Sequence, residues 1–134
     1  MPSYEIRRAT PADKPAIFQF LKQAYPQRWQ YKCPERWEWA YEKNPHLSGN
    51  QLPIWIALTG AGDIVGQSCS LVETLAIGNR VIKVAWGVDL VILEEHRRVG
   101  LGTRLKEANV MGNEVSMSMA MAGATKLING LASV

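Results

Sequence analysis

The residues best suited to chemistry lie in one stretch, VDLVILEEHRRVGLGTRL, at positions 88–105. An apolar run there is followed by Arg97, Arg98 and the glycines Gly100 and Gly102, an order that predicts a strand, a tight turn and the start of a helix. A helix N-terminus presents unpaired N–H groups and the positive end of the helix dipole. The two arginines add charge-assisted hydrogen bonds, each worth ~1.5–3 kcal/mol. We therefore expect an anion site here, and a pyrophosphate is the anion that fits it.

Two common phosphate-binding motifs do not match this stretch. The dinucleotide fingerprint needs a third glycine where the chain has Leu105, and no Gly-Lys-Ser/Thr triplet of a P-loop occurs in the chain. Residues 97–102, Arg-Arg-Val-Gly-Leu-Gly, instead match the pattern Arg/Gln-x-x-Gly-x-Gly/Ala after an apolar strand. On this motif, and on the order of elements before it, nearly the whole chain resembles the GNAT superfamily of acyl-CoA-dependent N-acyltransferases.

The resemblance implies acetyl-CoA as the co-substrate and no metal. The strand residues whose backbone would hold the pantetheine arm are Leu90, Val91, Ile92 and Leu93. The turn residues that would bind the pyrophosphate are Arg97, Arg98, Val99, Gly100, Leu101, Gly102 and Thr103. An N–H near Ile92 would polarise the thioester carbonyl. The chain departs from the family at Glu94, where the usual pattern has proline.

The implied reaction is direct attack of a primary amine on acetyl-CoA through a tetrahedral oxyanion. Glu73, at the expected end of the third strand, and Asp89, on the fourth, are the candidate bases. Each has a plainer alternative, since Glu73 can simply be solvated and Asp89 can pair with a nearby Arg or Lys. His96 titrates in the useful range, but its place at the turn favours contact with the cofactor.

Composition restricts the class of protein. The chain has 134 residues and a net charge of +3, which suits one domain that binds an anionic cofactor. No run of five Lys or Arg suggests nucleic acid or a membrane surface. Cys33 and Cys69 are too few and too isolated for a disulfide framework or a zinc site. The N-terminus lacks an apolar signal-peptide region, so we expect a cytoplasmic protein.

The elements that must position the site can be read in order. Residues 4–9 predict a first strand, and Thr10-Pro11-Ala12-Asp13 resembles a capping box, with Asp13 as an alternative cap for the helix that follows. A second helix is expected from Pro34 to about Lys43, with Trp37 and Tyr41 on one face and Trp39 elsewhere. Core packing is the plain interpretation of these rings, and an acceptor pocket is the functional one.

The strands expected next are 53–58, 64–72 and 81–93, in which Gly87 indicates a bulge or a close backbone approach. A helix should run from about Leu101 to Met111, followed by a strand over 115–121 and a short helix over 123–131. These elements predict an α+β (mixed α/β) fold, a mostly antiparallel sheet flanked by helices. A GNAT core continues with two more strands, so we expect residues 1–134 to be one domain, incomplete at its C-terminus.

Incompleteness has two interpretations, a fragment of a longer protein, which we favour, or a chain that completes its sheet with a partner. An open apolar strand edge also predicts a homodimer. Three functions follow: an N-acetyltransferase acting on a small-molecule or peptide amine, a non-catalytic acyl-CoA-binding module, and a basic module that binds nucleic acid phosphates, of which we favour the first. The second gains support because the family's usual acid is a tyrosine after the fifth strand, and residues 122–134 contain none.

Overall fold

The computed structural model describes residues 3–47, 49, 51–113 and 115–118. Its sheet has five strands in the order β1-β2-β3-β4-β5, all neighbours antiparallel except the parallel pair β4 and β5. The strands are β1 (Tyr4–Arg8), β2 (Ile54–Thr59), β3 (Ile64–Ile77), β4 (Arg80–Ile92) and β5 (Ser116–Ser118). The helical elements are η1 (Pro11–Asp13), α1 (Lys14–Ala24), α2 (Trp29–Lys32), α3 (Glu35–Trp37), η2 (Glu38–Glu42), η3 (Glu94–His96) and α4 (Leu101–Met111).

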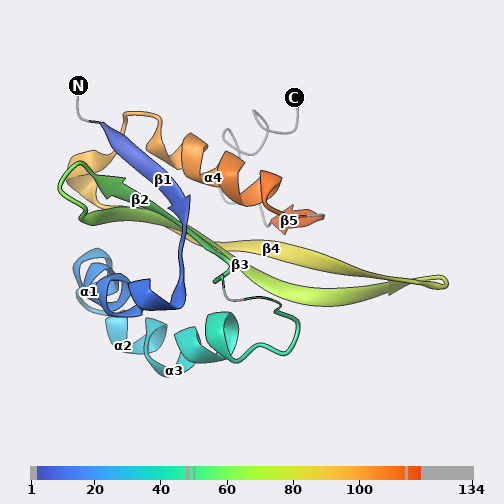
Figure 1. The fold of residues 1–134 in the computed structure, drawn as a ribbon. Helices are drawn as coiled ribbons and strands as arrows, with labels where there is room; N and C mark the ends of the chain where they lie inside the picture. The colour runs from blue at the N-terminus through green and yellow to red at the C-terminus, as the bar shows by residue number, and fades with distance from the viewer. Residues whose placement is uncertain (1–2, 48, 50, 114, 119–134) are drawn as a thin grey trace.

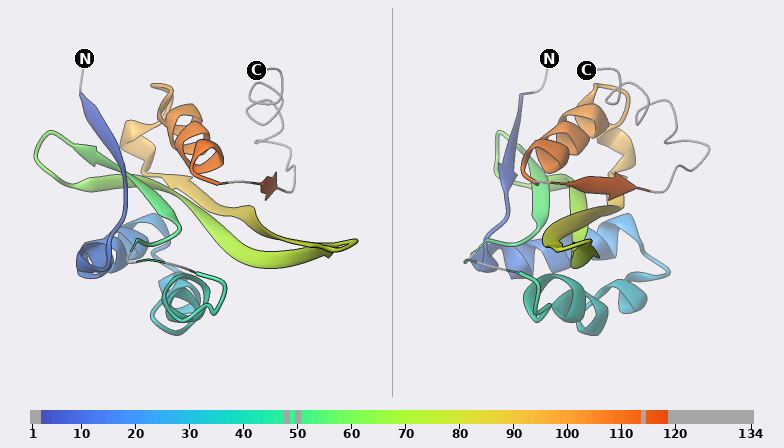
Figure 2. Two further views of the ribbon diagram at one scale, coloured as in Figure 1. Left: turned by 45° about the vertical axis from the view of Figure 1, so that its right-hand side comes forward. Right: turned by 90° about the vertical axis from the view of Figure 1, so that its right-hand side faces the viewer.

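Helices cover both faces of the sheet. Figure 1 and Figure 2 show α1, α2 and α3 on one face and α4 on the other, with the β3–β4 hairpin extending beyond both layers. A mixed α+β fold with a mostly antiparallel sheet is therefore confirmed. The expected strand over 115–121 is described only as far as residue 118, and the helix expected over 123–131 lies outside the described residues.

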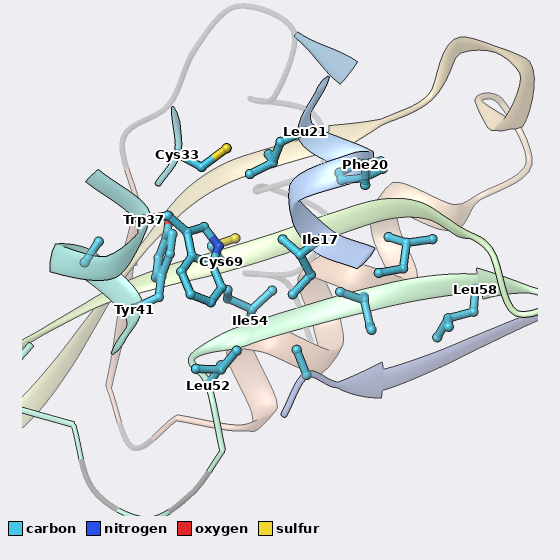
Figure 3. Packing of buried hydrophobic residues seen from close by; sticks show 14 residues of the cluster. Ile17, Phe20, Leu21, Cys33, Trp37, Tyr41, Leu52, Ile54, Leu58 and Cys69 are labelled. Carbon is cyan, nitrogen blue, oxygen red and sulfur yellow. The ribbon is translucent and has the colours of Figure 1, made fainter. Parts of the chain in front are cut away.

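The larger core lies between the sheet and the first helices. Figure 3 shows Ile17 of α1, Trp37 and Tyr41 of the α3–η2 segment, and Ile54 of β2 packed together. Trp37 and Tyr41 are buried, whereas Trp39 is 66% exposed, as the helical spacing predicted. The expected single helix from Pro34 is two short elements, because the last part of it forms π-helical rather than α-helical hydrogen bonds.

The connection from β1 to α1 satisfies both predictions about its cap. Asp13 ends the 3-10 turn η1, where it accepts a hydrogen bond from the Thr10 N–H at 2.8 Å, and it is also the N-cap of α1. Its carboxylate forms a two-pronged ion pair with Arg7, both N···O distances being 2.8 Å. The Arg7 guanidinium is the largest cause that lowers the pKa of Asp13 to about 2. The first helix is thus fixed to the first strand.

The β3–β4 hairpin is longer than its expected strands. β3 runs to Ile77 rather than to Val72, so Glu73 lies inside the strand and its expected position at the strand end is wrong. The turn at Gly78, whose φ is +60°, closes the hairpin at its far tip, and pairing continues on both sides of it.

Among the helices that the structure describes, none combines the length and the apolar character of a membrane span.

Candidate functional site

The glycine turn after β4 leads directly into α4, which begins at Leu101 as the sequence predicted. Gly100 is the N-cap residue, with φ +79°. Apart from its two chain neighbours, no described residue has a heavy atom within 4 Å of the place where its Cβ would be. The first N–H groups of an α-helix have no intrahelical partner, and in α4 no cap side chain accepts a hydrogen bond from them. The turn is therefore open above a helix N-terminus whose donors are available to an anion.

Two contacts fix the turn against the sheet. The Arg97 Nε donates a hydrogen bond to the Ile92 carbonyl oxygen at 2.8 Å, which ties the turn to the end of β4. A Cβ on Gly102 would lie 3.3 Å from the Ile92 side chain, so this glycine allows α4 to approach the strand closely. Arg97 and Arg98 are both exposed, and Arg98 adopts the left-handed φ of +69°. Both guanidinium groups are thus exposed beside the start of α4.

His96 is held by β1. Its Nδ1 lies 2.8 Å from the Tyr4 hydroxyl oxygen, and the two rings meet edge to face with centroids 5.6 Å apart. This contact fixes η3 against the first strand of the sheet. His96 has one ring nitrogen engaged away from the turn, a contact that the sequence did not indicate.

Beyond Gly87, no other strand among the described residues pairs with the outer edge of β4. Pairing with β5, within the described residues, covers only 85–87. The Leu93 N–H donates to the Val65 carbonyl oxygen of β3 at 2.8 Å. Because backbone groups of successive strand residues point to alternate sides, the N–H groups of Ile92 and Leu90 point away from β3. Two donors thus face the open edge beside the glycine turn.

A bulge in β4 lies at Asp89, two residues after the glycine that the sequence marked. Gln67 pairs with Val91 and Cys69 pairs with Val88, so β4 has one extra residue between these pairs. Asp89 adopts a φ of +53°, and its carbonyl oxygen accepts a hydrogen bond from the Gln67 Nε2 at 3.1 Å. The Gln67 Oε1 is buried and has no hydrogen-bond partner among the described residues.

The Asp89 carboxylate is 10% exposed and joins β4 to the helical face. It accepts hydrogen bonds from the Lys32 Nζ at 3.1 Å, an Arg36 guanidinium nitrogen at 2.9 Å and the Tyr41 hydroxyl at 2.5 Å. Burial raises the pKa of this carboxyl, but the hydrogen bonds from Tyr41 and Arg36 outweigh burial, so its pKa lies below its ordinary value. Pairing of Asp89 with Lys and Arg is therefore what the structure shows.

Glu73 lies elsewhere on the same sheet. It accepts a hydrogen bond from the Trp86 Nε1 at 3.2 Å. It pairs with Val84, and Asp89 is five residues further along β4, so about 13–16 Å of strand separates the two carboxylates. Glu73 lines a cavity of about 350 Å³. The other lining residues are Trp39, Asn44, Pro45, His46, Leu71, Val72 and Thr74.

Sequence reasoning missed several residues around β4. Lys32, Arg36 and Gln67 contact Asp89, and Lys106 of α4 lies against Gly87. Lys32 and Arg36 are four residues apart, a spacing that can place two side chains on one helical face, and this was the one local signal. Nothing in the sequence connects that pair with a carboxylate more than fifty residues away.

Solved structures of similar fold include several acetyltransferases. The superposition with glucosamine-6-phosphate N-acetyltransferase from Arabidopsis thaliana covers 97% of this chain and 90% of that enzyme, with 14% sequence identity and a TM-score of 0.63. An aminoglycoside acetyltransferase from a soil metagenome, solved in complex with sisomicin, is matched over 97% of this chain and 86% of its own, with 22% identity and a TM-score of 0.64. A GNAT-family N-acetyltransferase from Escherichia coli, solved in complex with CoA, is matched over 84% of this chain and 57% of its own, with 16% identity and a TM-score of 0.59.

No protein-family model matches the sequence, and no curated protein is significantly similar to it. The likeness is one of structure, and it confirms the predicted fold. At these identities it does not identify an acceptor or a mechanism. The roles of the individual residues must therefore be argued from the geometry around β4.

The Asp89 cluster should matter for stability. We expect Asp89→Asn to lower the free energy of unfolding by about 2 kcal/mol at pH 7, because the part-buried Lys32 and the exposed Arg36 lose their shared counter-charge and two hydrogen-bond donors lose a charged acceptor. The folded-state pKa of Asp89 is lowered, so this stabilisation is present above the ordinary Asp pKa of about 3.9 and is lost as the pH falls below it. Urea unfolding at pH 7 and at a pH below about 3.9 measures the difference.

The control is Glu95→Gln, which removes an exposed carboxylate of η3. It should unfold like the parent at either pH. Equal stability of Asp89→Asn and the parent at pH 7 would contradict the stabilising role of the cluster.

Proposed function

We propose that this chain, which has the fold of the GNAT acetyltransferases, transfers an acetyl group from acetyl-CoA to a primary amine. The single observation that carries the proposal is the junction of β4 and α4. There, a strand edge that no described strand covers beyond Gly87 leads into a helix N-terminus at Gly100 that has no side-chain cap. A ligand with an extended amide chain could form hydrogen bonds with the strand edge. A pyrophosphate at one end of it could accept hydrogen bonds from the N–H groups of the helix N-terminus.

The residues present suit acetyl-CoA. Arg97, Arg98 and the N–H groups of residues 101–103 would hold the pyrophosphate, and the space above Gly100 is open to it. The outward backbone groups of Leu90 and Ile92 would pair with the pantetheine arm, while Val91 and Leu93 stay in the ladder with β3. When bound, the cofactor supplies an activated acyl group as a thioester.

The reacting carbonyl belongs at the Leu90 end of this edge. With the phosphate end at the turn, the arm would run along β4 away from the turn and would pass Ile92 before Leu90. The Leu90 N–H is thus the donor, near Ile92 as the family pattern implies, that would polarise the thioester carbonyl. It would also stabilise the oxyanion formed when the amine attacks.

The two carboxylates take different parts in this proposal. Asp89 accepts three hydrogen bonds and has a lowered pKa, so it is a weak base. We assign it the positioning of the bulge that aims the Leu90 N–H, and the proton of the amine leaves to water. Glu73 would bind a cationic group of the acceptor in its cavity, together with the exposed face of Trp39.

A non-catalytic acyl-CoA-binding module is the alternative. The observation that favours it is that the Asp89 carboxylate already accepts three hydrogen bonds and has a lowered pKa. The carboxylate nearest to the proposed thioester is therefore a poor proton acceptor. Both functions need the same cofactor site. They differ only in whether an amine is acetylated.

A thermal melt tests the cofactor site. With acetyl-CoA at 100 times its Kd, linkage predicts about 2.7 kcal/mol of stabilisation, a shift of several degrees for a domain of this size. In Arg97→Ala/Arg98→Ala the shift should vanish at the same concentration, because the charge-assisted hydrogen bonds are lost.

Arg28→Ala/Arg80→Ala is the matched control, since it removes two exposed arginines away from the turn. It should keep the full shift. A parent melt that acetyl-CoA leaves unchanged, or equal shifts in both double variants, would refute this cofactor site.

An assay of thiol release with a panel of primary amines separates the two functions. A transferase should turn over at least one amine, and in Glu73→Gln the KM for that amine should rise about 10-fold with little change in kcat, because a binding contact is lost. Glu107→Gln, on the exposed side of α4, should behave like the parent. Cofactor binding without turnover of any amine would favour the binding module.

A further inference from the structure

Lys106 is a buried cation that the proposed mechanism does not use. It lies in α4 and is 9% exposed. Among the described residues it has no hydrogen-bond or ion-pair partner. Lysine is almost never buried without a partner, so this position needs a reason beyond packing.

The ammonium group lies over β4 where β5 joins it. A Cβ on Gly87 would collide with the Lys106 Nζ and would lie 3.7 Å from the Met117 carbonyl oxygen of β5. Gly87 pairs with Ser118, the last described residue of β5. The sequence predicted a bulge or a close backbone approach at Gly87; the bulge lies at Asp89 instead, and the group that approaches Gly87 most closely is the Lys106 side chain. The ammonium therefore lies at the inner end of the β4 edge that β5 leaves unpaired among the described residues.

This place is close to the proposed thioester. Gly87 lies three residues before Leu90, and one of the residues between them is the extra residue of the bulge, so about 7–10 Å of strand separates them. The arm of the cofactor would run from the glycine turn past Ile92 to Leu90. Its sulfur end would then point toward Gly87 and the ammonium above it.

We propose that Lys106 donates a proton to the sulfur of CoA as it leaves, an inference that rests on the proposed function. The nitrogen of the amine forms a bond to the acetyl carbon, and the carbon–sulfur bond then breaks with its electron pair on sulfur. The Lys106 Nζ transfers one proton to that sulfur and gives free CoA thiol. The neutral amine of Lys106 then regains a proton from solvent.

The surroundings of Lys106 favour this role. Burial lowers the pKa of Lys106, and no charged group adds to this effect. The polar side chains of α4 and β3 beside it are neutral and bonded to one another, since Asn109 accepts a hydrogen bond from Ser70 at 2.6 Å and donates one to Ser68 at 3.0 Å. A lysine with a lowered pKa gives up its proton more readily near neutral pH.

The test measures the thiol pKa of bound CoA, by thiolate absorbance between about pH 6 and pH 10 with the protein in excess. In the parent we expect a value about one unit below the ordinary thiol value of about 8.5, because the ammonium stabilises the thiolate. In Lys106→Met the value should return to about 8.5 or above. Arg104→Met removes one exposed positive charge from the same helix and should leave the parent value unchanged.

Desulfo-CoA, which lacks the sulfur, separates the possible failures. If Lys106→Met binds desulfo-CoA as the parent does, the site is folded, and its single-turnover acetyl transfer should be ~10- to 100-fold slower. Lys106→Arg keeps the charge and should retain the lowered thiol pKa if the neutral variant does not fold. An unshifted thiol pKa in a parent that binds desulfo-CoA overturns the role of Lys106 alone. A parent that does not bind desulfo-CoA overturns the cofactor site as well.

Discussion

Asp89 is a charged residue placed where the sheet can least easily accept it. It adopts a left-handed backbone conformation inside a strand, and its carboxylate is 10% exposed. Non-glycine residues rarely adopt such a conformation, although Asp tolerates it better than most. Hydrogen bonds from Lys32, Arg36 and Tyr41 offset the cost of burying the charge. The bulge and the helical layer therefore hold each other in place.

The candidate site depends on this arrangement. Because β4 has one extra residue between Val88 and Val91, the alternation of its inward and outward backbone groups shifts by one residue there. Leu90, whose N–H points outward, follows Asp89, and Gly87, which Lys106 approaches closely, precedes it. The glycine turn, in contrast, is local, since Gly100 and Arg97 need only the end of β4 and the start of α4. One half of the site is thus set by a short motif and the other half by packing between layers.

This difference explains what the sequence could predict. The bounds of α4 and the left-handed glycine turn follow from neighbouring residues, and so does the burial of Trp37 and Tyr41 on one helical face. Partners of Asp89 come from segments 48 to 57 residues away, as the bonds to Tyr41 and Lys32 show, and no local pattern reveals such contacts. Glu73 was misplaced because apolar alternation weakens past Val72 although pairing continues to the tip of the hairpin.

In the proposed function, the outer edge of β4 and the first turn of α4 together form one cofactor site. The most direct measurement is the titration of the ¹⁵N-labelled chain with CoA, followed by the backbone amide resonances. The account predicts that the largest shifts occur at Leu90 and Ile92 and at residues 101–103, and that they saturate together. Shifts confined to the turn, or centred on the cavity beside Glu73, would contradict it.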